Sequence, residues 1–251
     1  MDLEGLYQRV CEWWSSLDEL ERTTRLVCFA PKFAYHSVRI EDKHATPELA
    51  REAFESDSVT AYTGPLSTLC EIKGQKDSFA RMLGDLRRAR AFDESLVLET
   101  HEDLTWGTYN ARQLADGERP GTWRLGDYLV PGANEVGAPA EDVPGLVHDL
   151  CAEVNDVIEG ATPKRALTTA SYFHAAFETI HPFSDGSGLC GRELMNHILL
   201  RGGHPPVIVF FEDKNAYYEA LDAFNRQGDL DPFRRLVMAE AIKTWRERAG
   251  L

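Results

Sequence analysis

The sequence has few cysteines, and they are scattered. Cys11, Cys28, Cys70, Cys151 and Cys190 are an odd number of residues and include no CxxC pair. Such a set is typical of reduced thiols and gives no zinc-binding pattern. The eight histidines likewise show no HExxH or similar ligand spacing. The sequence therefore gives no sign of a disulfide framework or a zinc site.

Long apolar runs are also absent. No stretch approaches the roughly 20 apolar residues that a membrane-spanning helix needs. The first ten residues, MDLEGLYQRV, are acidic rather than charged and then apolar, as a secretory signal would be. We therefore expect a cytoplasmic protein without a membrane partner.

Positive charge is scarce. The chain has 27 Lys and Arg against 41 Asp and Glu, which gives a formal net charge of −14. Contacts to nucleic-acid phosphates require clustered basic side chains, so this balance argues against nucleic acid as a partner. At 251 residues, with no repeat or low-complexity linker, the chain fits one domain with an elaborated N-terminal part.

Helical periodicity dominates what is present. It extends over residues 4–17, 48–56, 76–92, 143–160, 167–180, 193–200 and 216–228. Residues 123–136 instead alternate and end in turn residues, which is typical of a hairpin. The pattern predicts a mainly α-helical fold with one short β-hairpin.

The segment HPFSDGSGLCGR, residues 181–192, carries the chemistry. Pro182 stops the preceding helix at His181, so this titratable side chain lies at a helix end. Gly186 and Gly188 permit a tight turn and a close approach of ligand to backbone. The following helical pattern places a helix N-terminus here, whose N–H groups and dipole favour a phosphate.

An acidic residue, Asp185, stands beside this predicted anion site. A cation would reconcile the two, and Mg²⁺ held by one carboxylate and phosphate oxygens fits. Arg192 can reach back to a phosphate or a carboxylate. The segment thus indicates phosphoryl or nucleotidyl transfer, with His181 as general base. The alternative is a structural joint in which His181 caps a helix, Phe183 fills the core and the glycines turn the chain.

The segment resembles the signature of the Fic family, HPFx(D/E)GNGRxxR. His181, Pro182, Phe183, Asp185, Gly186, Gly188 and Arg192 match; Ser187 replaces the Asn and Leu189 replaces the first Arg. GERPGTWR (117–124) and the stretch 204–233 are also similar to family segments. The resemblance covers about residues 100–240.

The resemblance implies a Fic-like helical bundle with a β-hairpin flap and an enzyme that moves AMP from ATP to a protein hydroxyl. His181 would deprotonate that hydroxyl, and Asp185 would hold Mg²⁺ on the α and β phosphates. Backbone N–H groups of Gly186, Ser187 and Gly188 would form the anion hole, and Arg192 would contact the terminal phosphate. The flap would hold the target as an added strand.

An upstream segment, FAYHSVRIED (33–42), resembles the inhibitory helix of many Fic proteins, written (S/T)xxxE(G/N). Ser37 and Glu41 match, and Asp42 stands where Gly or Asn is usual. In the family this glutamate pairs with the second signature arginine, here Arg192, and blocks the γ-phosphate. The weaker alternative is Ser67 to Glu71, which has the same spacing.

We therefore expect an N-terminal helical region over residues 1–99 and a Fic-like catalytic core over 100–245. The predicted function is Mg²⁺-dependent nucleotidyl transfer from ATP to a hydroxyl acceptor. Two alternatives stay open: another phosphate-containing donor or a small-molecule acceptor, and a catalytically silent binding module. Retention of His181 and Asp185 favours an enzyme, whereas the loss of the signature Asn and Arg, replaced by Ser187 and Leu189, favours altered chemistry. On this basis, restoring Asn at 187 and Arg at 189 would raise ATP affinity.

Overall fold

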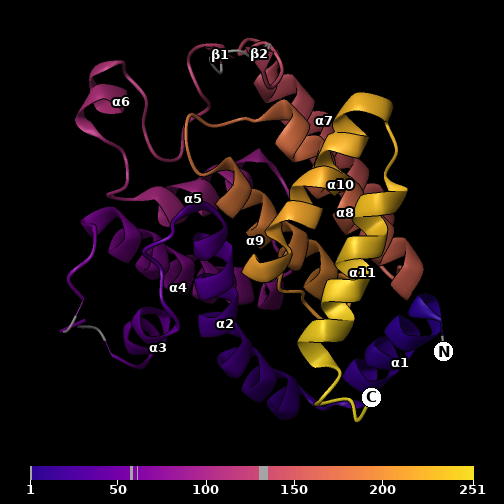
Figure 1. Ribbon diagram of the computed structural model, residues 1–251. Helices are drawn as coiled ribbons and strands as arrows, with labels where there is room; N and C mark the ends of the chain where they lie inside the picture. Colours follow the sequence, from indigo (N-terminus) through magenta and orange to yellow (C-terminus); the bar gives the residue numbers. More distant parts are fainter. Residues whose placement is uncertain (1, 57–58, 61, 130–134) are drawn as a thin grey trace.

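Helices form nearly all of the regular structure in the computed structural model, which describes residues 2–56, 59–60, 62–129 and 135–251 (Figure 1). They are α1 (Leu3–Ser16), α2 (Glu19–Glu41), α3 (Pro47–Glu55), α4 (Leu66–Arg87), α5 (Glu94–Thr105), α6 (Ala111–Ala115), α7 (Val143–Ile158), α8 (Pro163–Ile180), α9 (Ser187–Arg201), the 3₁₀ turn η1 (Phe211–Asp213), α10 (Lys214–Gln227) and α11 (Asp231–Trp245). The predicted mainly α-helical class is confirmed.

Polar caps in the sequence fix where several helices begin. Asp2 accepts the Gly5 N–H at 2.7 Å ahead of α1. Asp18 forms a reciprocal capping box with Glu21 at the start of α2. Thr162 caps α8, whose first residue is a proline. Each cap satisfies a backbone N–H that the first helical turn leaves without an intrahelical acceptor.

The predicted hairpin over residues 123–136 is only partly strand. Two short strands, β1 (Tyr128–Leu129) and β2 (Glu135–Val136), pair antiparallel. In their register Tyr128 lies opposite Val136 and Leu129 opposite Glu135. Residues 130–134 of the predicted hairpin lie outside the described residues. The role of this segment as a target-binding flap stays a prediction.

Helix boundaries differ from the periodicity in informative places. Helix α2 begins at Glu19, well before residue 33, and α5, α6 and α11 are additional. Helix α9 begins at Ser187 rather than near residue 193. Nearly every α9 side chain is buried, so the helix has no solvent-facing stripe and its sequence lacks a clear 3.6-residue pattern.

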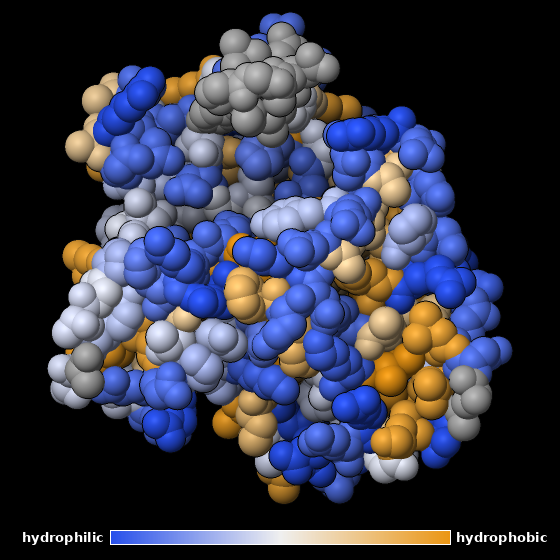
Figure 2. All heavy atoms as spheres, viewed as in Figure 1, coloured by the Kyte–Doolittle hydropathy of each residue, from blue (hydrophilic) through white to orange (hydrophobic). Residues whose placement is uncertain are grey.

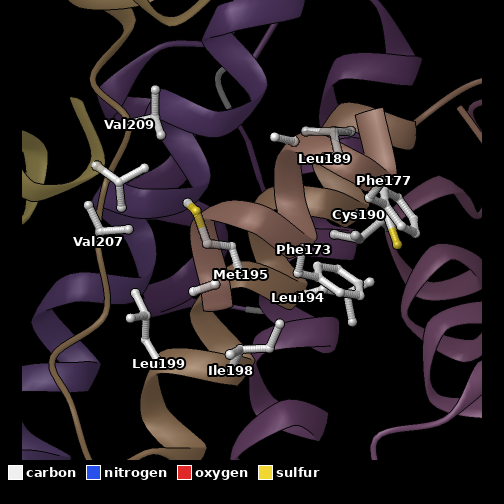
Figure 3. Close-up of a cluster of buried hydrophobic side chains, with 14 of the residues drawn as sticks. Phe173, Phe177, Leu189, Cys190, Leu194, Met195, Ile198, Leu199, Val207 and Val209 are labelled. Atoms are coloured by element: carbon white, nitrogen blue, oxygen red, sulfur yellow. The ribbon is translucent and has the colours of Figure 1, made fainter. Parts of the chain in front are cut away.

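Helix α9 lies at the centre of the fold. It packs against α8, α5, α4, α7 and α2, so elements from both halves of the chain surround it (Figure 1). Figure 3 shows apolar side chains of α8, of α9 and of residues 207–209 meeting around this helix. Rigid packing on all sides fixes the position of the loop that precedes α9.

A second apolar cluster joins the N-terminal helices to the end of the chain. Trp14 of α1, Phe29 of α2 and Trp245 of α11 are its centre, and Phe29 stacks on Trp245 with ring centroids 5.7 Å apart.

Hydrophilic residues cover much of the face in Figure 2. Within the described part of the chain, none of the helices combines the length and apolar character of a membrane span.

Candidate active site

His181 lies at the turn between α8 and α9 in an unusual backbone conformation. Its φ of 50° and ψ of 66° are left-handed, and its N–H donates to the Phe177 carbonyl at 2.9 Å. Left-handed geometry is costly for a residue with a Cβ, so the surroundings must hold it. Together with Pro182 it ends α8 and turns the chain into the loop.

A buried arginine, Arg124, clamps this turn. Its Nε donates to the His181 carbonyl at 2.7 Å, and its own backbone N–H donates to the Pro182 carbonyl at 3.0 Å. Its Nη2 donates to the Ala138 carbonyl, while the Ala138 N–H donates to the Ile180 carbonyl at 3.1 Å. The segments on both sides of β1 and β2 are thereby tied to the histidine turn.

His101 of α5 holds the other half of the loop. Its ring stacks on Phe183 with centroids 3.6 Å apart and planes 4° from parallel. Because Nδ1 accepts the Gly121 N–H at 2.9 Å, Nε2 carries the proton and donates to the Asp185 carbonyl at 2.9 Å. Burial lowers the pKa of His101 to about 4, so the ring is neutral and serves as a fixed support.

Ser187 faces inward. Its hydroxyl accepts the Phe183 N–H at 3.2 Å and donates to the Phe183 carbonyl at 3.4 Å, and the residue is buried. It therefore stabilises the loop that leads into α9. Its predicted part in nucleotide binding would rest on its backbone N–H rather than on its hydroxyl.

Leu189 packs in the main core. It is 3% exposed and lies among apolar side chains that α8 and α9 contribute (Figure 3). An arginine introduced here would meet apolar neighbours at its base. The expected gain in phosphate contacts from restoring that arginine therefore does not follow from this structure.

Arg192, one turn further along α9, is bound to the end of α2. Its Nε donates to the Ser37 hydroxyl at 3.0 Å, and its Nη2 donates to the Ser37 carbonyl at 3.0 Å and to Glu41 Oε1 at 2.6 Å. The guanidinium is buried, whereas the Glu41 side chain is 35% exposed. The structure thus brings Ser37, Glu41 and Arg192 together; an inhibitory role for the pair stays a prediction.

The Glu41 carboxylate also lies against Gly188. A Cβ on Gly188 would come within 2.9 Å of Arg192 Nη1 and 3.3 Å of Glu41 Cδ, so a larger residue here would displace the pair from its present position. Gly188 is in the first turn of α9, where free N–H groups and the helix dipole favour an anion. Glu41 therefore places a carboxylate in the predicted anion site.

Two aromatic residues support Arg192 from the other side. Its Nη1 donates to the Tyr217 hydroxyl at 3.3 Å, and this hydroxyl is 2.8 Å from Nε2 of His174. Burial and the charge of Arg192 lower the pKa of His174 to about 3, so its ring is neutral. This chain of contacts fixes the guanidinium between α2 and α10.

Asp42 ends the helix that carries Glu41. Its N–H donates to the Val38 carbonyl at 2.8 Å, and its carboxylate accepts the Thr68 hydroxyl and the His44 N–H. It stands where a small residue is usual in the inhibitory pattern, and it anchors the end of α2 to α4. Helix α2 continues up to Glu41.

Asp185 is an exposed residue of the loop between α8 and α9. Its Oδ1 accepts the Gly186 N–H at 2.9 Å. Desolvation by the surrounding protein raises the pKa of Asp185, and the negative charge of Glu41 raises it further. Burial raises the pKa of Glu71 to about 8, and nearby acidic residues, among them Glu41 and Asp185, add to this. The alternative glutamate of the inhibitory pattern therefore lies in the same acidic surroundings.

The residues present fit Mg²⁺ that is shared with a ligand. Among the described residues, no group of three or more His, Cys, Asp and Glu side chains could enclose a metal ion. One exposed carboxylate in an acidic environment suits Mg²⁺, which keeps waters and completes its shell with phosphate oxygens. Asp185 is the residue that would hold it.

His181 is half-buried, and its pKa is shifted downward. Burial is the main cause, the positive charge of Arg124 adds to it, and Glu41 opposes it. The imidazole is therefore neutral at pH 7 and can accept a proton. This is the protonation state that a general base requires.

A cavity of about 880 Å³ adjoins the histidine turn. Residues of α7, α8 and α10 line it together with Gly137 and Ala138, and Glu178 and Ile180 lie on its α8 side. Burial raises the pKa of Glu178 to about 7. A cavity of this size can accommodate a nucleotide-sized molecule.

Three residues that support the site are not indicated by the sequence. His101, Arg124 and Tyr217 act through contacts with residues 84, 57 and 25 positions away. Arg124 ends the segment GERPGTWR and Tyr217 lies in a helical pattern, but neither context predicts the partner. Their roles depend on tertiary packing.

Comparison with known proteins gives a family match over the same region. The model of the Fic/DOC family matches residues 91–199, which include the loop and α9. A protein named protein adenylyltransferase Fic, from Nematostella vectensis, is 40% identical over 103 residues. That alignment covers 39% of this chain and 24% of the relative. The chain thus spans about a quarter of the length of that relative.

Two solved structures share the fold over almost the whole chain. A Fic domain containing signaling protein from Bacteroides thetaiotaomicron has a TM-score of 0.79 at 18% identity, covering 98% of this chain and 95% of the other. Fic-1 from C. elegans has a TM-score of 0.75 at 22% identity, covering 99% and 72%. At these identities the likeness shows the fold alone.

Proposed function

Residues 91–199 belong to the Fic/DOC family, and from that premise we propose that this chain transfers AMP from ATP to a hydroxyl group. The acceptor is a protein hydroxyl or, as the less favoured variant, that of a small molecule. The name of the Nematostella vectensis relative, protein adenylyltransferase Fic, supports the choice of AMP.

The observation that carries the proposal is the position of Glu41. Its carboxylate lies against Gly188 in the first turn of α9 and pairs with buried Arg192 at 2.6 Å. A helix N-terminus beside a buried guanidinium is a strong site for an oxyanion. A terminal phosphate has the same chemistry, so a nucleoside triphosphate would compete with Glu41 for this place.

Protonation states and positions support the roles proposed for the other residues. Neutral His181 takes the proton of the acceptor hydroxyl, whose oxygen bonds to the α-phosphorus of ATP. The bond between the α-phosphorus and its bridging oxygen breaks, and pyrophosphate leaves. Asp185 would hold Mg²⁺, which supplies charge neutralisation on the phosphates when bound. The first N–H groups of α9, at Ser187 and Gly188, bind phosphate oxygens.

An altered donor is the second candidate, and one observation favours it. Leu189, which replaces a basic residue of the signature, is buried in the core, and the Ser187 hydroxyl is bonded within the loop. Arg192 is then the signature's remaining guanidinium for phosphate. A donor with two phosphates, such as a CDP-linked compound, needs fewer phosphate-binding side chains than ATP does.

Transfer from ATP labelled on the α-phosphate tests the proposal. We expect Glu41→Gly to label itself or added proteins in the presence of Mg²⁺, and Glu41→Gly with His181→Ala to lose about 10²–10⁴-fold in rate. Nucleotide binding by the double variant, measured by calorimetry, is expected to stay nearly unchanged.

Three outcomes would contradict the proposal, each in a different part. Equal loss of binding and turnover in the double variant removes His181 as base. Transfer from a CDP-linked donor but not from ATP selects the second candidate. Binding of every donor without transfer supports a silent binding module.

A further inference from the structure

A second concave site lies between α2 and the C-terminal end of α11, which we name the α2–α11 pocket. Its volume is about 340 Å³, and its lining is Arg25, Cys28, Phe29, Lys32, Ile208, Phe210, Lys243, Thr244, Trp245, Arg246, Glu247 and Arg248. Arg25 precedes Glu41 by 16 residues, about 24 Å along a helix. The pocket is therefore separate from the candidate active site.

The residues that line the pocket carry a net positive charge, whereas the whole chain carries a net negative charge. Five of its residues are basic and one is acidic, in a protein with a net charge of −14. Lys243 and Arg246 lie at the end of α11, where cations stabilise the helix dipole. Arg25 and Lys32 lie in the interior of α2, so the dipole of α11 does not account for them.

The floor of the pocket is aromatic. Phe29 stacks on Trp245, and the Nζ atoms of Lys32 and Lys243 lie 4.9 and 4.2 Å from the centroid of the Phe210 ring. Lys243 also pairs with Asp213 at 2.5 Å. Positive groups are thus held around an apolar base, which can receive the less polar part of a ligand.

One donor in the lining has no acceptor. Arg25 Nε is buried and has no hydrogen-bond partner among the residues that the structure describes. A buried guanidinium donor without an acceptor costs free energy, and an oxyanion in the pocket would supply that acceptor. This orphan donor is independent of the charge count and indicates the same class of ligand.

We propose that the α2–α11 pocket binds a phosphorylated small molecule. Its phosphate is held by Arg25 and Lys32 on α2 and by the guanidinium groups that follow α11, and its remaining part rests on the aromatic floor. Guanidinium groups on two sides suit a phosphate better than a single carboxylate, because phosphate accepts more charge-assisted hydrogen bonds. The volume fits a small molecule. This proposal does not depend on the activity of the Fic domain.

Cys28 gives a local readout of occupancy. It lines the pocket and is exposed, whereas Cys11, Cys151 and Cys190 are buried. With Cys70→Ser in place, the rate of Cys28 labelling by a thiol reagent is measured with and without pyrophosphate at constant ionic strength. We expect about tenfold slower labelling when pyrophosphate is at ten times its Kd, because about one pocket in eleven stays empty.

Charge-removing variants locate the effect. Arg25→Gln with Lys32→Gln is expected to abolish protection by pyrophosphate, and Arg246→Gln with Arg248→Gln, whose side chains are exposed, is expected to weaken it. Lys164→Gln with Arg165→Gln removes the same charge from an exposed part of α8 and is expected to leave protection unchanged. Thermal unfolding establishes that each variant is folded.

The probes also distinguish classes of anion. Inorganic phosphate and AMP are expected to protect Cys28, with AMP the stronger because its base reaches the aromatic floor. Equal protection by succinate would overturn the assignment to phosphate. The site itself would be overturned if no phosphate protects Cys28. It would also be overturned if protection persists both in Arg25→Gln with Lys32→Gln and in Arg246→Gln with Arg248→Gln.

Discussion

Glu41 Oε1 lies 2.6 Å from Nη2 of Arg192, although 151 residues separate them in the chain. The contact joins the last residue of α2 to the first turns of α9. It also fills the space beside Gly188. The end of one helix thus supplies the anion for the start of another, and the pair is the natural point at which to test control of the site.

Replacing Glu41 by glycine is expected to raise ATP affinity and self-modification. The substitution removes the carboxylate that competes with a terminal phosphate for Arg192 and the α9 N-terminus. Glu55→Gly is the matched control, because Glu55 is the exposed last residue of α3. Glu71 is unsuitable, because its pKa, raised mainly by burial, is raised further by the charges of Glu41 and Asp185, so its removal would also change the surroundings of Glu41. An equal gain in both variants would remove the inhibitory role of Glu41.

The pH dependence of transfer is expected to report the pKa of His181. Burial and Arg124 lower this pKa below its ordinary value of 6.5, so the base is neutral at pH 7 and charges only at lower pH. The acidic limb of turnover should therefore have its midpoint below pH 6.5, the ordinary pKa of histidine.

Glu41 shifts the pKa of His181 in the direction opposite to burial and Arg124. Its negative charge raises the pKa of His181, so Glu41→Gly is expected to move the acidic limb to still lower pH. NMR titration of the His181 ring in both proteins gives the pKa directly. A limb that moves to higher pH in the variant would show that another group controls the profile.

Asp185→Asn is expected to remove the dependence of ATP affinity on Mg²⁺. The amide keeps the shape and the capacity to accept the Gly186 N–H but loses the charge that a divalent cation requires. Calorimetry with and without Mg²⁺ measures the difference, with Asp116→Asn as an exposed control. If affinity in the parent protein never depends on Mg²⁺, the assignment of the metal to Asp185 fails.

Leu189→Arg is expected to destabilise the protein rather than to improve nucleotide binding. The leucine is 3% exposed, and a guanidinium in its place would lower the free energy of unfolding by about 3 kcal/mol or more. Leu20→Arg, at a site 76% exposed on α2, should stay within about 1 kcal/mol. Urea unfolding compares the two. A stable Leu189→Arg variant with tighter ATP binding would restore the first expectation.

Tyr217→Phe tests the support behind Arg192. Loss of the hydroxyl removes the acceptor for Nη1 and the partner of His174, which should lower the free energy of unfolding by about 1–3 kcal/mol. Tyr218→Phe, next in sequence and half exposed, should change it by less than about 0.5 kcal/mol. Equal effects would show that the buried hydroxyl contributes nothing particular.

The sequence by itself determined the class of fold and the position of the loop. Helical periodicity predicts most helices, because an amphipathic helix carries its apolar stripe within a few turns of the chain. Pro182 and Gly186 locate the turn between α8 and α9 for the same local reason. Helix α9 begins earlier than its pattern suggests, since burial on every side removes the stripe.

Only the tertiary structure decided which distant residues meet. The resemblance favours Glu41 over Glu71, which has the same spacing to a serine, but the contact of Glu41 with Arg192 itself depends on how α2 packs near α9. The orientation of Leu189 into the core and the clamp by Arg124 are likewise long-range contacts. Hydrogen bonds and apolar packing between elements depend on positions in space, which local sequence patterns do not specify.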